Sequence, residues 1–305
     1  MRIRRASCTA AVTVTRFIRK MRGIAQAILA EASDGNLYVV KFGNSSHGPN
    51  LLFRESVGTE LYRISSLPVP PWRAVILGKS FVDKNPGCWL NTNEQLARPQ
   101  CALCFGSQYL GEKSFEILEI LPSSFHKWVQ NRADFWRAWL IDALAGHTDC
   151  RQAIFRMRDR GKIDAIFIDQ GAMFGGAEAD PCTFVAASRY LDRRIYEGIS
   201  DLSLSALKHQ VSQLDFDRLW QTINHLPSEW RTSSAIRCFS QAINTLAQSR
   251  AVDQTLQTMV QCQFGLADQG GTTFLSRKPV RAASPAAVQV GARTALGNGK
   301  PACVR

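Results

Sequence analysis

Residues 25–42 read AQAILAEASDGNLYVVKF, and this stretch predicts the β-hairpin around which the rest of the chain can be interpreted. Its first part suits a strand, the Asp-Gly pair at 34–35 is a strong turn signal, and LYVVKF suits the returning strand. Side chains alternate along a strand, so Leu37, Val39 and Lys41 share one face. A lysine on such an apolar face needs an anionic partner, because burying an unpaired ammonium group is costly.

The next predicted helix carries two candidate partners for that lysine. Residues 51–65 have helical periodicity, and the proline-rich run after them ends the helix. Glu55 is the first choice, and it lies roughly along one face of the predicted helix with Leu52 and Tyr62. Glu60 is the second choice. In phosphoryl transfer, a lysine–glutamate pair of this kind holds the phosphates of a nucleotide. The alternative is that Lys41 is an exposed lysine at a sheet edge.

Two aspartates further along the chain occupy positions that suit the same chemistry. A long apolar helix is predicted over residues 125–146, and Asp149 lies in the polar loop HTDCRQ that follows it. A carboxylate there can accept a proton from an attacking hydroxyl group. Asp169 ends the apolar strand AIFID and precedes a glycine, an arrangement that often binds a metal ion in phosphoryl transferases. Taken singly, each aspartate is better explained as a capping or turn residue.

The order of these features is more informative than any one of them. A strand lysine comes first, then a helix glutamate, then an aspartate in a loop after a helix, and finally an aspartate at the end of a strand. Protein kinases present their catalytic parts in this order.

Five segments of the chain together resemble the HipA-like kinase domain found in many bacterial proteins, over about residues 20–240. The segments are MRGIAQAILAEASDGNLYVVKFGN, the helix ending in LPVP, FGSQYL, GHTDCRQAIF and FIDQGAMF. The resemblance implies an α+β, bilobed, protein-kinase-like fold, with a small β-rich N-lobe containing one helix and a larger, mainly helical C-lobe. It also implies that ATP and Mg²⁺ bind in the cleft, in a cytoplasmic protein.

The resemblance assigns roles to individual residues. Lys41 would contact the α- and β-phosphates of ATP, and Glu55 would orient it. Asp149 would be the catalytic aspartate. Metal ligation would fall to Asp169, with Gln152 beside it. Backbone groups in the loop before the hairpin would cover the phosphates, near Arg22, Gly23 and Gln26.

Three departures from the family pattern leave two functions open. Ile24 and Ala25 replace a glycine and a serine of the phosphate loop, which stiffens the loop. His147 stands where related sequences tend to have asparagine, and Ile154 stands where kinases carry a metal-binding asparagine. The chain is therefore expected either to transfer the γ-phosphate of ATP to a Ser or Thr hydroxyl, on a protein or on itself, or to act as a nucleotide-binding pseudokinase that docks or regulates a partner.

The sequence also suggests how the chain is divided. The predicted parts are a basic extension or edge strand over 1–19, a kinase-like N-lobe over 20–121 with an irregular insertion at 82–113, a helical C-lobe with the catalytic loop over 122–265, and a disordered basic tail over 266–305.

The charge of the chain is concentrated at its ends. The formal net charge is +12, yet residues 1–23 and 269–305 together carry thirteen basic and no acidic side chains. The body between them is therefore close to neutral, which disfavours a basic nucleic-acid groove. Weak contact of the ends with polyanions, or a nucleic-acid-binding regulator acting through them, is the third hypothesis. No apolar run is long enough for a membrane helix, so a soluble protein is expected.

The nine cysteines predict reduced thiols rather than a disulfide framework, because their number is odd and they are scattered. Cys101 and Cys104, with Cys88 upstream, supply half of a zinc-ligand pattern. No second pair of ligands follows, so we expect ordinary buried or surface thiols.

Overall fold

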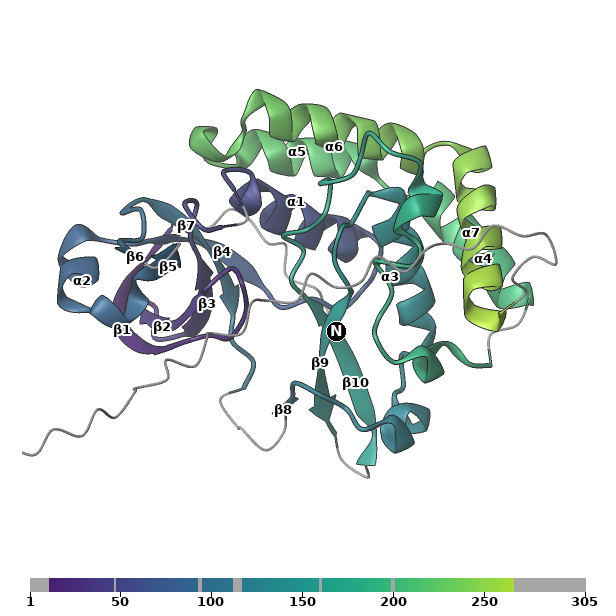
Figure 1. The fold of residues 1–305 in the computed structure, drawn as a ribbon, viewed down its shortest axis with the longest axis horizontal. Helices are drawn as coiled ribbons and strands as arrows, with labels where there is room; N and C mark the ends of the chain where they lie inside the picture. The colour runs from purple at the N-terminus through teal and green to yellow at the C-terminus, as the bar shows by residue number, and fades with distance from the viewer. Residues whose placement is uncertain are drawn as a thin grey trace, which may run out of the picture. The chain divides into compact units, whose positions relative to one another are not determined.

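The computed structural model describes residues 11–46, 48–92, 95–111, 117–158, 161–198 and 201–265, and these form an α+β structure (Figure 1). Residues 1–10 and 266–305 lie outside the described residues, so the predicted disorder of the tail stays a prediction. Among the described residues, every helix is too short or too polar to cross a bilayer.

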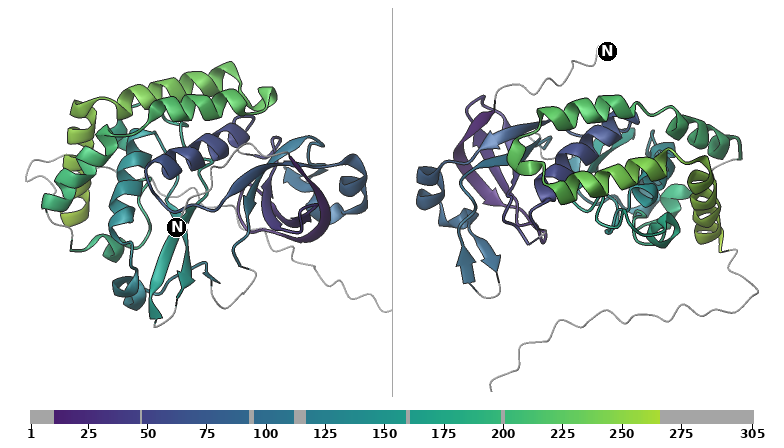
Figure 2. Two further views of the ribbon diagram at one scale, coloured as in Figure 1. Left: turned by 180° about the vertical axis from the view of Figure 1, so that it is seen from behind. Right: turned by 90° about the horizontal axis from the view of Figure 1, so that it is seen from above.

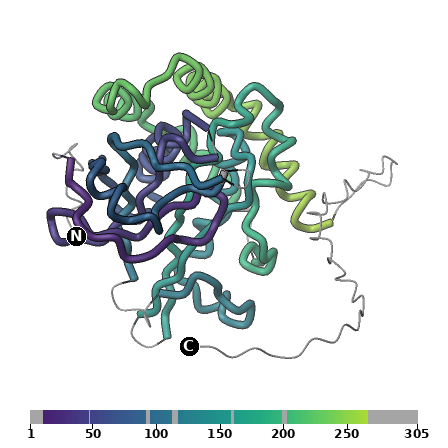
Figure 3. The backbone as a smooth tube through the Cα atoms, turned by 60° about the vertical axis from the view of Figure 1, so that its left-hand side comes forward, coloured from purple at the N-terminus to yellow at the C-terminus, as the bar shows by residue number. Residues whose placement is uncertain are grey.

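The N-terminal part of the chain is a closed five-stranded barrel, and the tube in Figure 3 follows its path. The strand order is β1-β2-β3-β7-β4, and the barrel closes where β1 pairs in parallel with β4. All other neighbours in the barrel are antiparallel. The strands are β1 (Val12–Lys20), β2 (Ile28–Ala32), β3 (Leu37–Lys41), β4 (Trp72–Ile76) and β7 (Leu103–Gln108).

The predicted hairpin is confirmed as the pair β2–β3, although its first strand begins at Ile28 rather than at residue 25. Gly35 has a φ of +76°, a conformation that glycine adopts at little cost. The Asp34 carboxylate accepts hydrogen bonds from the Asn36 amide at 3.2 Å and the Tyr38 hydroxyl at 2.8 Å. Local turn chemistry therefore fixes the register that brings Lys41 to the end of β3.

Two predictions about this part of the chain are wrong. The strand expected at an edge within residues 1–19 extends to Lys20 as β1 and has a partner on both sides, because its alternate side chains Val12 and Val14 fill the barrel. The region 82–113 is not irregular throughout. It holds β7 as an internal strand of the barrel, together with the shorter elements α2 (Lys79–Lys84), η1 (Pro86–Cys88), β5 (Leu90–Thr92) and β6 (Gln95–Ala97).

Helix α1 (Leu51–Ile64) belongs to the larger hydrophobic core rather than to the interior of the barrel. It lies beside helix α5 (Phe216–His225) in both views of Figure 2. The Phe53 ring of α1 meets Phe239 of α6 (Ser233–Leu246) edge-on, with ring centroids 6.2 Å apart. Most of α1 is buried, so its polar residues require partners inside the protein.

The remainder of the described chain is mainly helical and encloses the larger core. A long antiparallel pair, β9 with β10, carries the short strand β8 at its edge. The elements are β8 (Ile117–Leu118), η2 (Ser123–Trp128), α3 (Ala133–Leu144), β9 (Gln152–Met157), β10 (Ile163–Ile168), η4 (Pro181–Phe184), η5 (Arg193–Tyr196), α4 (Asp201–Ser212), η6 (Ser228–Trp230), α6 (Ser233–Leu246) and α7 (Ser249–Phe264).

The single helix predicted over residues 125–146 is wrong, because Val129 is extended and residues 130–132 form a turn between η2 and α3. Val129 forms a parallel bridge with Ile163 of β10. Asn131 then binds the backbone of Ala165 through both side-chain atoms, at 2.9 and 3.0 Å. Pairing with the outer edge of β10, which has no strand neighbour on that side among the described residues of its sheet, thus replaces the helical hydrogen bonds that the local pattern predicts.

We expect Gly106→Ala to destabilise the barrel. A Cβ atom on Gly106 would lie 2.2 Å from the Val75 Cγ2 atom of the neighbouring strand. Relieving such overpacking typically costs about 1–3 kcal/mol. Thermal unfolding should therefore show a Tm several degrees below wild type. The control is Gly78→Ala, where the added Cβ has no atom within 4 Å and the φ of −80° suits alanine. An equal Tm for the two variants would contradict this packing.

Candidate functional site

Three segments far apart in the sequence meet at the Lys41 ammonium group. Lys41 ends β3, Glu55 lies on α1, and Asp169 follows β10. The Lys41 Nζ atom contacts Glu55 Oε1 directly and lies 2.8 Å from Asp169 Oδ1. The side chains of Lys41 and Glu55 are 10% and 1% exposed, whereas that of Asp169 is 35% exposed. The cluster is therefore buried on one side and open at Asp169.

Burial and charge act in opposite directions on these three groups. Burial alone would lower the pKa of Lys41, but the carboxylates of Glu55 and Asp169 outweigh it and raise the pKa above its ordinary value. Burial raises the pKa of Glu55 to about 7, against the opposing charge of Lys41. Burial would also raise the pKa of Asp169, but Lys41 lowers it well below its usual range. Lys41 and Asp169 are consequently both charged at neutral pH.

Glu60, the second candidate partner of Lys41, is engaged elsewhere. Its Oε1 atom accepts a hydrogen bond from the Trp72 indole at 2.8 Å and pairs with Arg63 at 2.8 Å. Glu55, rather than Glu60, contacts Lys41.

Two glycines allow α1 to approach the chain after β10. A Cβ atom on Gly171 would lie 2.6 Å from Glu55 Oε1, and one on Gly58 would lie 2.7 Å from the Gln170 Cβ atom. At this contact the backbone amide of Gln170 donates to Glu55 Oε2 at 3.3 Å, and the Thr59 hydroxyl donates to the side-chain Oε1 atom of Gln170 at 3.4 Å. The position of Glu55 is thus tied to that of the residue after Asp169.

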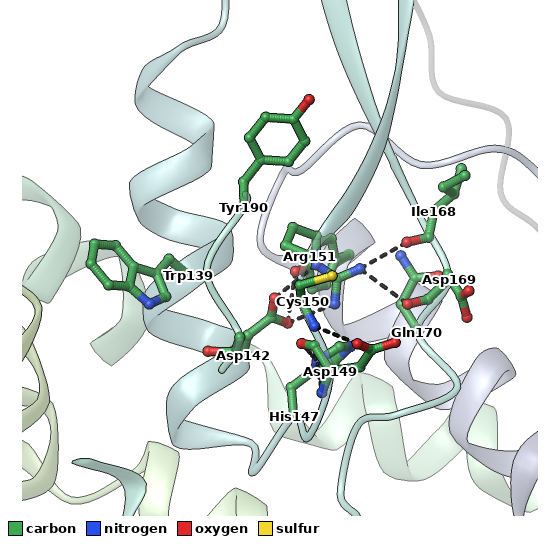
Figure 4. A network of polar contacts seen from close by, with 12 residues as sticks. Trp139, Asp142, His147, Asp149, Cys150, Arg151, Ile168, Asp169, Gln170 and Tyr190 are labelled. Atoms are coloured by element: carbon green, nitrogen blue, oxygen red, sulfur yellow. Dashed lines mark hydrogen bonds and ion pairs between the residues drawn. The ribbon is translucent and has the colours of Figure 1, made fainter. Parts of the chain in front are cut away.

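Asp149 lies in the loop between α3 and β9, with an exposed carboxylate (Figure 4). The Cys150 amide donates to Asp149 Oδ1 at 2.8 Å. The His147 ring lies with Nδ1 2.6 Å from the Asp149 carbonyl oxygen, and burial lowers the pKa of this histidine. The Thr148 amide donates to the Ala172 carbonyl at 3.2 Å, which holds the loop beside the segment that follows Asp169.

Arg151 lies at the centre of a buried polar network beneath this loop (Figure 4). Its Nε and Nη2 atoms bind the two carboxylate oxygens of Asp142 at 2.7 and 3.0 Å. Its Nη1 atom donates to the carbonyls of Ile168 at 2.8 Å and Asp169 at 3.2 Å. The Tyr62 hydroxyl donates to Asp142 at 2.8 Å. These contacts satisfy a buried ion pair that would otherwise be costly.

The Asp142–Arg151 pair was not among the predicted site residues. The sequence does carry one signal for it, because Asp142 interrupts the apolar run WLIDALAG in a helix that is expected to be buried. An acid at such a position needs a cationic partner. The sequence does not specify that the partner is Arg151, two residues after Asp149.

The predicted phosphate loop is a tight turn between β1 and β2. Gly23 and Gln26 have φ values of +115° and +50°. The Gln26 side-chain amide forms two hydrogen bonds with the backbone of Asn91, at 2.7 and 2.8 Å. The Ser46 hydroxyl donates to the Ile24 carbonyl at 3.0 Å, while the Ile24 side chain is exposed. The loop is therefore held by β5 and by the chain after β3.

The residues available to a metal ion near this site are few. Gln152 begins β9 opposite Ile168, and Ile154 lies two residues further along the strand, opposite Ile166. Among the described residues, no three His, Cys, Asp or Glu side chains are grouped so that they could hold a metal. Of the three cysteines in the partial zinc pattern, Cys88 and Cys104 are buried and Cys101 is exposed.

Comparisons with known proteins place few constraints on the chain. No protein-family model matches it, and no curated protein matches its sequence. Similar solved structures include a proinflammatory kinase of Helicobacter pylori, CtkA, with a TM-score of 0.49 and 12% identity over 83% of this chain and 99% of that one. The Golgi casein kinase has the same TM-score, identity and coverage of this chain, over 72% of its own length with Mn/ADP bound and 71% in a second structure. The resemblance to HipA-like domains stays a prediction from the quoted motifs.

We expect Glu55→Gln to destabilise the protein more than the matched change Glu60→Gln. Glu55 gives a buried ammonium group its second carboxylate, and losing a hydrogen bond to a charged group costs about 1.5–3 kcal/mol. Glu60 is also buried, but its cationic partner Arg63 is 17% exposed and can be solvated when the carboxylate is lost, and a glutamine can still accept the hydrogen bond from the Trp72 indole. Urea denaturation of both variants measures the difference. A larger loss in Glu60→Gln would show that Glu60 supports the cluster instead.

Proposed function

We propose that this protein is an ATP- and Mg²⁺-dependent phosphotransferase of the HipA-like type, which transfers the γ-phosphate to a Ser or Thr hydroxyl on a protein or on itself. The observation that carries the proposal is the buried Lys41–Glu55–Asp169 cluster, which opens at Asp169 and lies next to the loop that bears Asp149. A fixed cation beside an accessible carboxylate is what nucleotide phosphates and their metal ion require.

The predicted site residues would each have a role in this reaction. Lys41 would bind the α- and β-phosphates, and Glu55 would keep its ammonium group in place. Asp149 would accept the proton of the acceptor hydroxyl, since its carboxylate is exposed and bound only locally in the loop. Backbone groups around Arg22, Gly23 and Gln26 would lie over the phosphates.

The residues present are compatible with a magnesium ion. Mg²⁺ is usually held by one or two carboxylates and by the phosphates of the nucleotide, rather than by a complete protein cage. Asp169, with its partly exposed carboxylate, would supply the main ligand, and Gln152 would lie beside it at the start of β9. When bound, the ion would neutralise charge on the transferring phosphate.

One observation favours a second candidate, a nucleotide-binding pseudokinase that docks or regulates a partner. Ile154 lies in β9, paired with Ile166, at the place where kinases carry their second metal ligand. A site with a single metal position can bind nucleotide and still transfer phosphate slowly or not at all.

Transfer of labelled γ-phosphate from Mg-ATP tests the proposal. We expect incorporation by wild type and a loss of at least about 100-fold in Asp149→Ala and Asp169→Ala, since general-base catalysis alone contributes about 10²–10⁴-fold. Asp253→Ala is the matched control, because this exposed aspartate on α7 pairs only with Lys208. Wild-type activity in either site variant would remove that aspartate from the mechanism.

Mg-ATP binding, read together with the transfer assay, separates the two candidates. We expect Mg-ATP to raise the Tm of wild type, because a ligand that binds only the folded state stabilises it. Lys41→Met should abolish the shift, since it removes the cation proposed to bind the phosphates. Stabilisation of wild type without transfer to itself or to a protein mixture would favour the pseudokinase. Absence of both effects would overturn nucleotide binding altogether.

A further inference from the structure

We propose that Arg151 is a positioning residue, which holds Asp169 in the one backbone conformation that directs its carboxylate to Lys41. The effect of Arg151 on phosphate transfer rests on the proposed function. Its effect on the position of Asp169 does not, because that effect follows from the contacts among Arg151, Asp142 and Asp169. Arg151 itself is fully buried, so it acts through these groups and not on a substrate.

The first step of the argument is the backbone of Asp169. Its φ is +62°, in the left-handed region that residues with a Cβ atom rarely occupy. Such a conformation persists only when its surroundings hold it in place. Asp169 also lies just after β10, so the ladder of that strand does not fix it.

The second step is the pair of hydrogen bonds that Arg151 makes here. Its Nη1 atom donates to the carbonyls of Ile168 and Asp169, the two peptide groups on either side of the unusual φ. Figure 4 shows both bonds converging on the end of the guanidinium group. Rotation of either peptide group would break one of these bonds and change the backbone conformation at Asp169.

The third step is what holds Arg151 in place. The other edge of its guanidinium group donates to both carboxylate oxygens of Asp142 on α3. The same carboxylate also accepts a hydrogen bond from the Tyr62 hydroxyl of α1. The Tyr62 ring also lies 5.0 Å from the guanidinium carbon. Arg151 is therefore fixed by the helix that bears Glu55 and by the helix that precedes Asp149.

One planar group thus connects the three parts of the proposed site. Arg151 is two residues from Asp149 in the chain, it holds the carbonyl of Asp169, and it reaches α1 through Asp142 and Tyr62. A guanidinium group presents its donors in a rigid fork, whereas a lysine ammonium is a single point of charge. Lysine can keep the ion pair with Asp142 but cannot at the same time reach the two carbonyls in this geometry.

The test compares Arg151→Lys with Arg137→Lys. Arg137 on α3 is the control, because its side chain is only 16% exposed and it also donates to a carbonyl, that of Ser65, and pairs with Asp134 rather than with Asp142 or Asp169. For each protein we would measure kcat, the KM for ATP and the Mg²⁺ concentration that gives half-maximal transfer. Hydrogen exchange of the nucleotide-free proteins supplies a readout that does not depend on activity.

We expect Arg151→Lys to raise the half-maximal Mg²⁺ concentration at least about 10-fold, and Arg137→Lys to leave it unchanged. A structural role alone would lower Tm and the active fraction without moving this concentration. The backbone amide of Gln170, which donates to Glu55, should exchange its hydrogen at least about 10-fold faster in Arg151→Lys than in wild type. The backbone amides inside β9 and β10 should keep their protection. Unchanged exchange at Gln170 together with unchanged metal dependence would overturn the inference.

A balanced triple variant guards against simple unfolding. Asp142→Leu with Arg151→Met replaces the buried ion pair by apolar groups of similar shape, a change that is often neutral for stability, and adding Tyr62→Phe removes the hydroxyl that would otherwise lose its acceptor. We expect this variant to fold, with Gln170 exchange as fast as in Arg151→Lys. If wild type itself transfers no phosphate, the proposed function fails, but the positioning role is still tested by hydrogen exchange. Exchange of the Gln170 backbone amide as slow in this variant as in wild type would then overturn the positioning role.

Discussion

The burial of the Lys41 ammonium group between two carboxylates is the constraint on which the rest of this structure depends. A buried cation is tolerated only if acids reach it, and the two acids come from α1 and from the end of β10. The barrel, the first helix and the β9–β10 hairpin must therefore dock against each other at one point. Gly58 and Gly171 are the places where that docking leaves no room for a Cβ atom.

A second buried ion pair, Asp142 with Arg151, lies immediately behind the first. Buried pairs contribute little net stability, because desolvation offsets their attraction. Their effect here is on geometry, since the guanidinium group binds the carbonyl of Asp169 on one side and the carboxylate of Asp142 on the other. Two cations and their acids thus form a continuous polar layer between α1, α3 and the two loops that carry Asp149 and Asp169. The proposed phosphoryl transfer would need such fixed charges, because that chemistry consists largely of positioning and electrostatic stabilisation.

Sequence patterns predicted secondary structure correctly where interactions between residues close in sequence determine it. The β2–β3 hairpin was predictable because an Asp-Gly turn fixes its own register, and α1 was predictable from periodicity. Predictions failed where a distant segment competes for the backbone. The helix expected over residues 125–146 gives way at Val129, which pairs with β10, and β1 is an internal strand because β4 closes the barrel on it. Neither pairing partner is near in sequence, so no local signal specifies it.

The sequence by itself determined the chemical parts of the candidate site and their order: a strand lysine, a helix glutamate and two aspartates after apolar segments. It did so because an ionisable residue within an apolar pattern must find a partner, whatever the fold. Only the tertiary structure decided between Glu55 and Glu60, and only it brought Arg151 to Asp142 and to the carbonyl of Asp169. The reason is that an ion pair requires a few ångströms of precision, and that precision is set by the packing of helices and strands from distant parts of the chain.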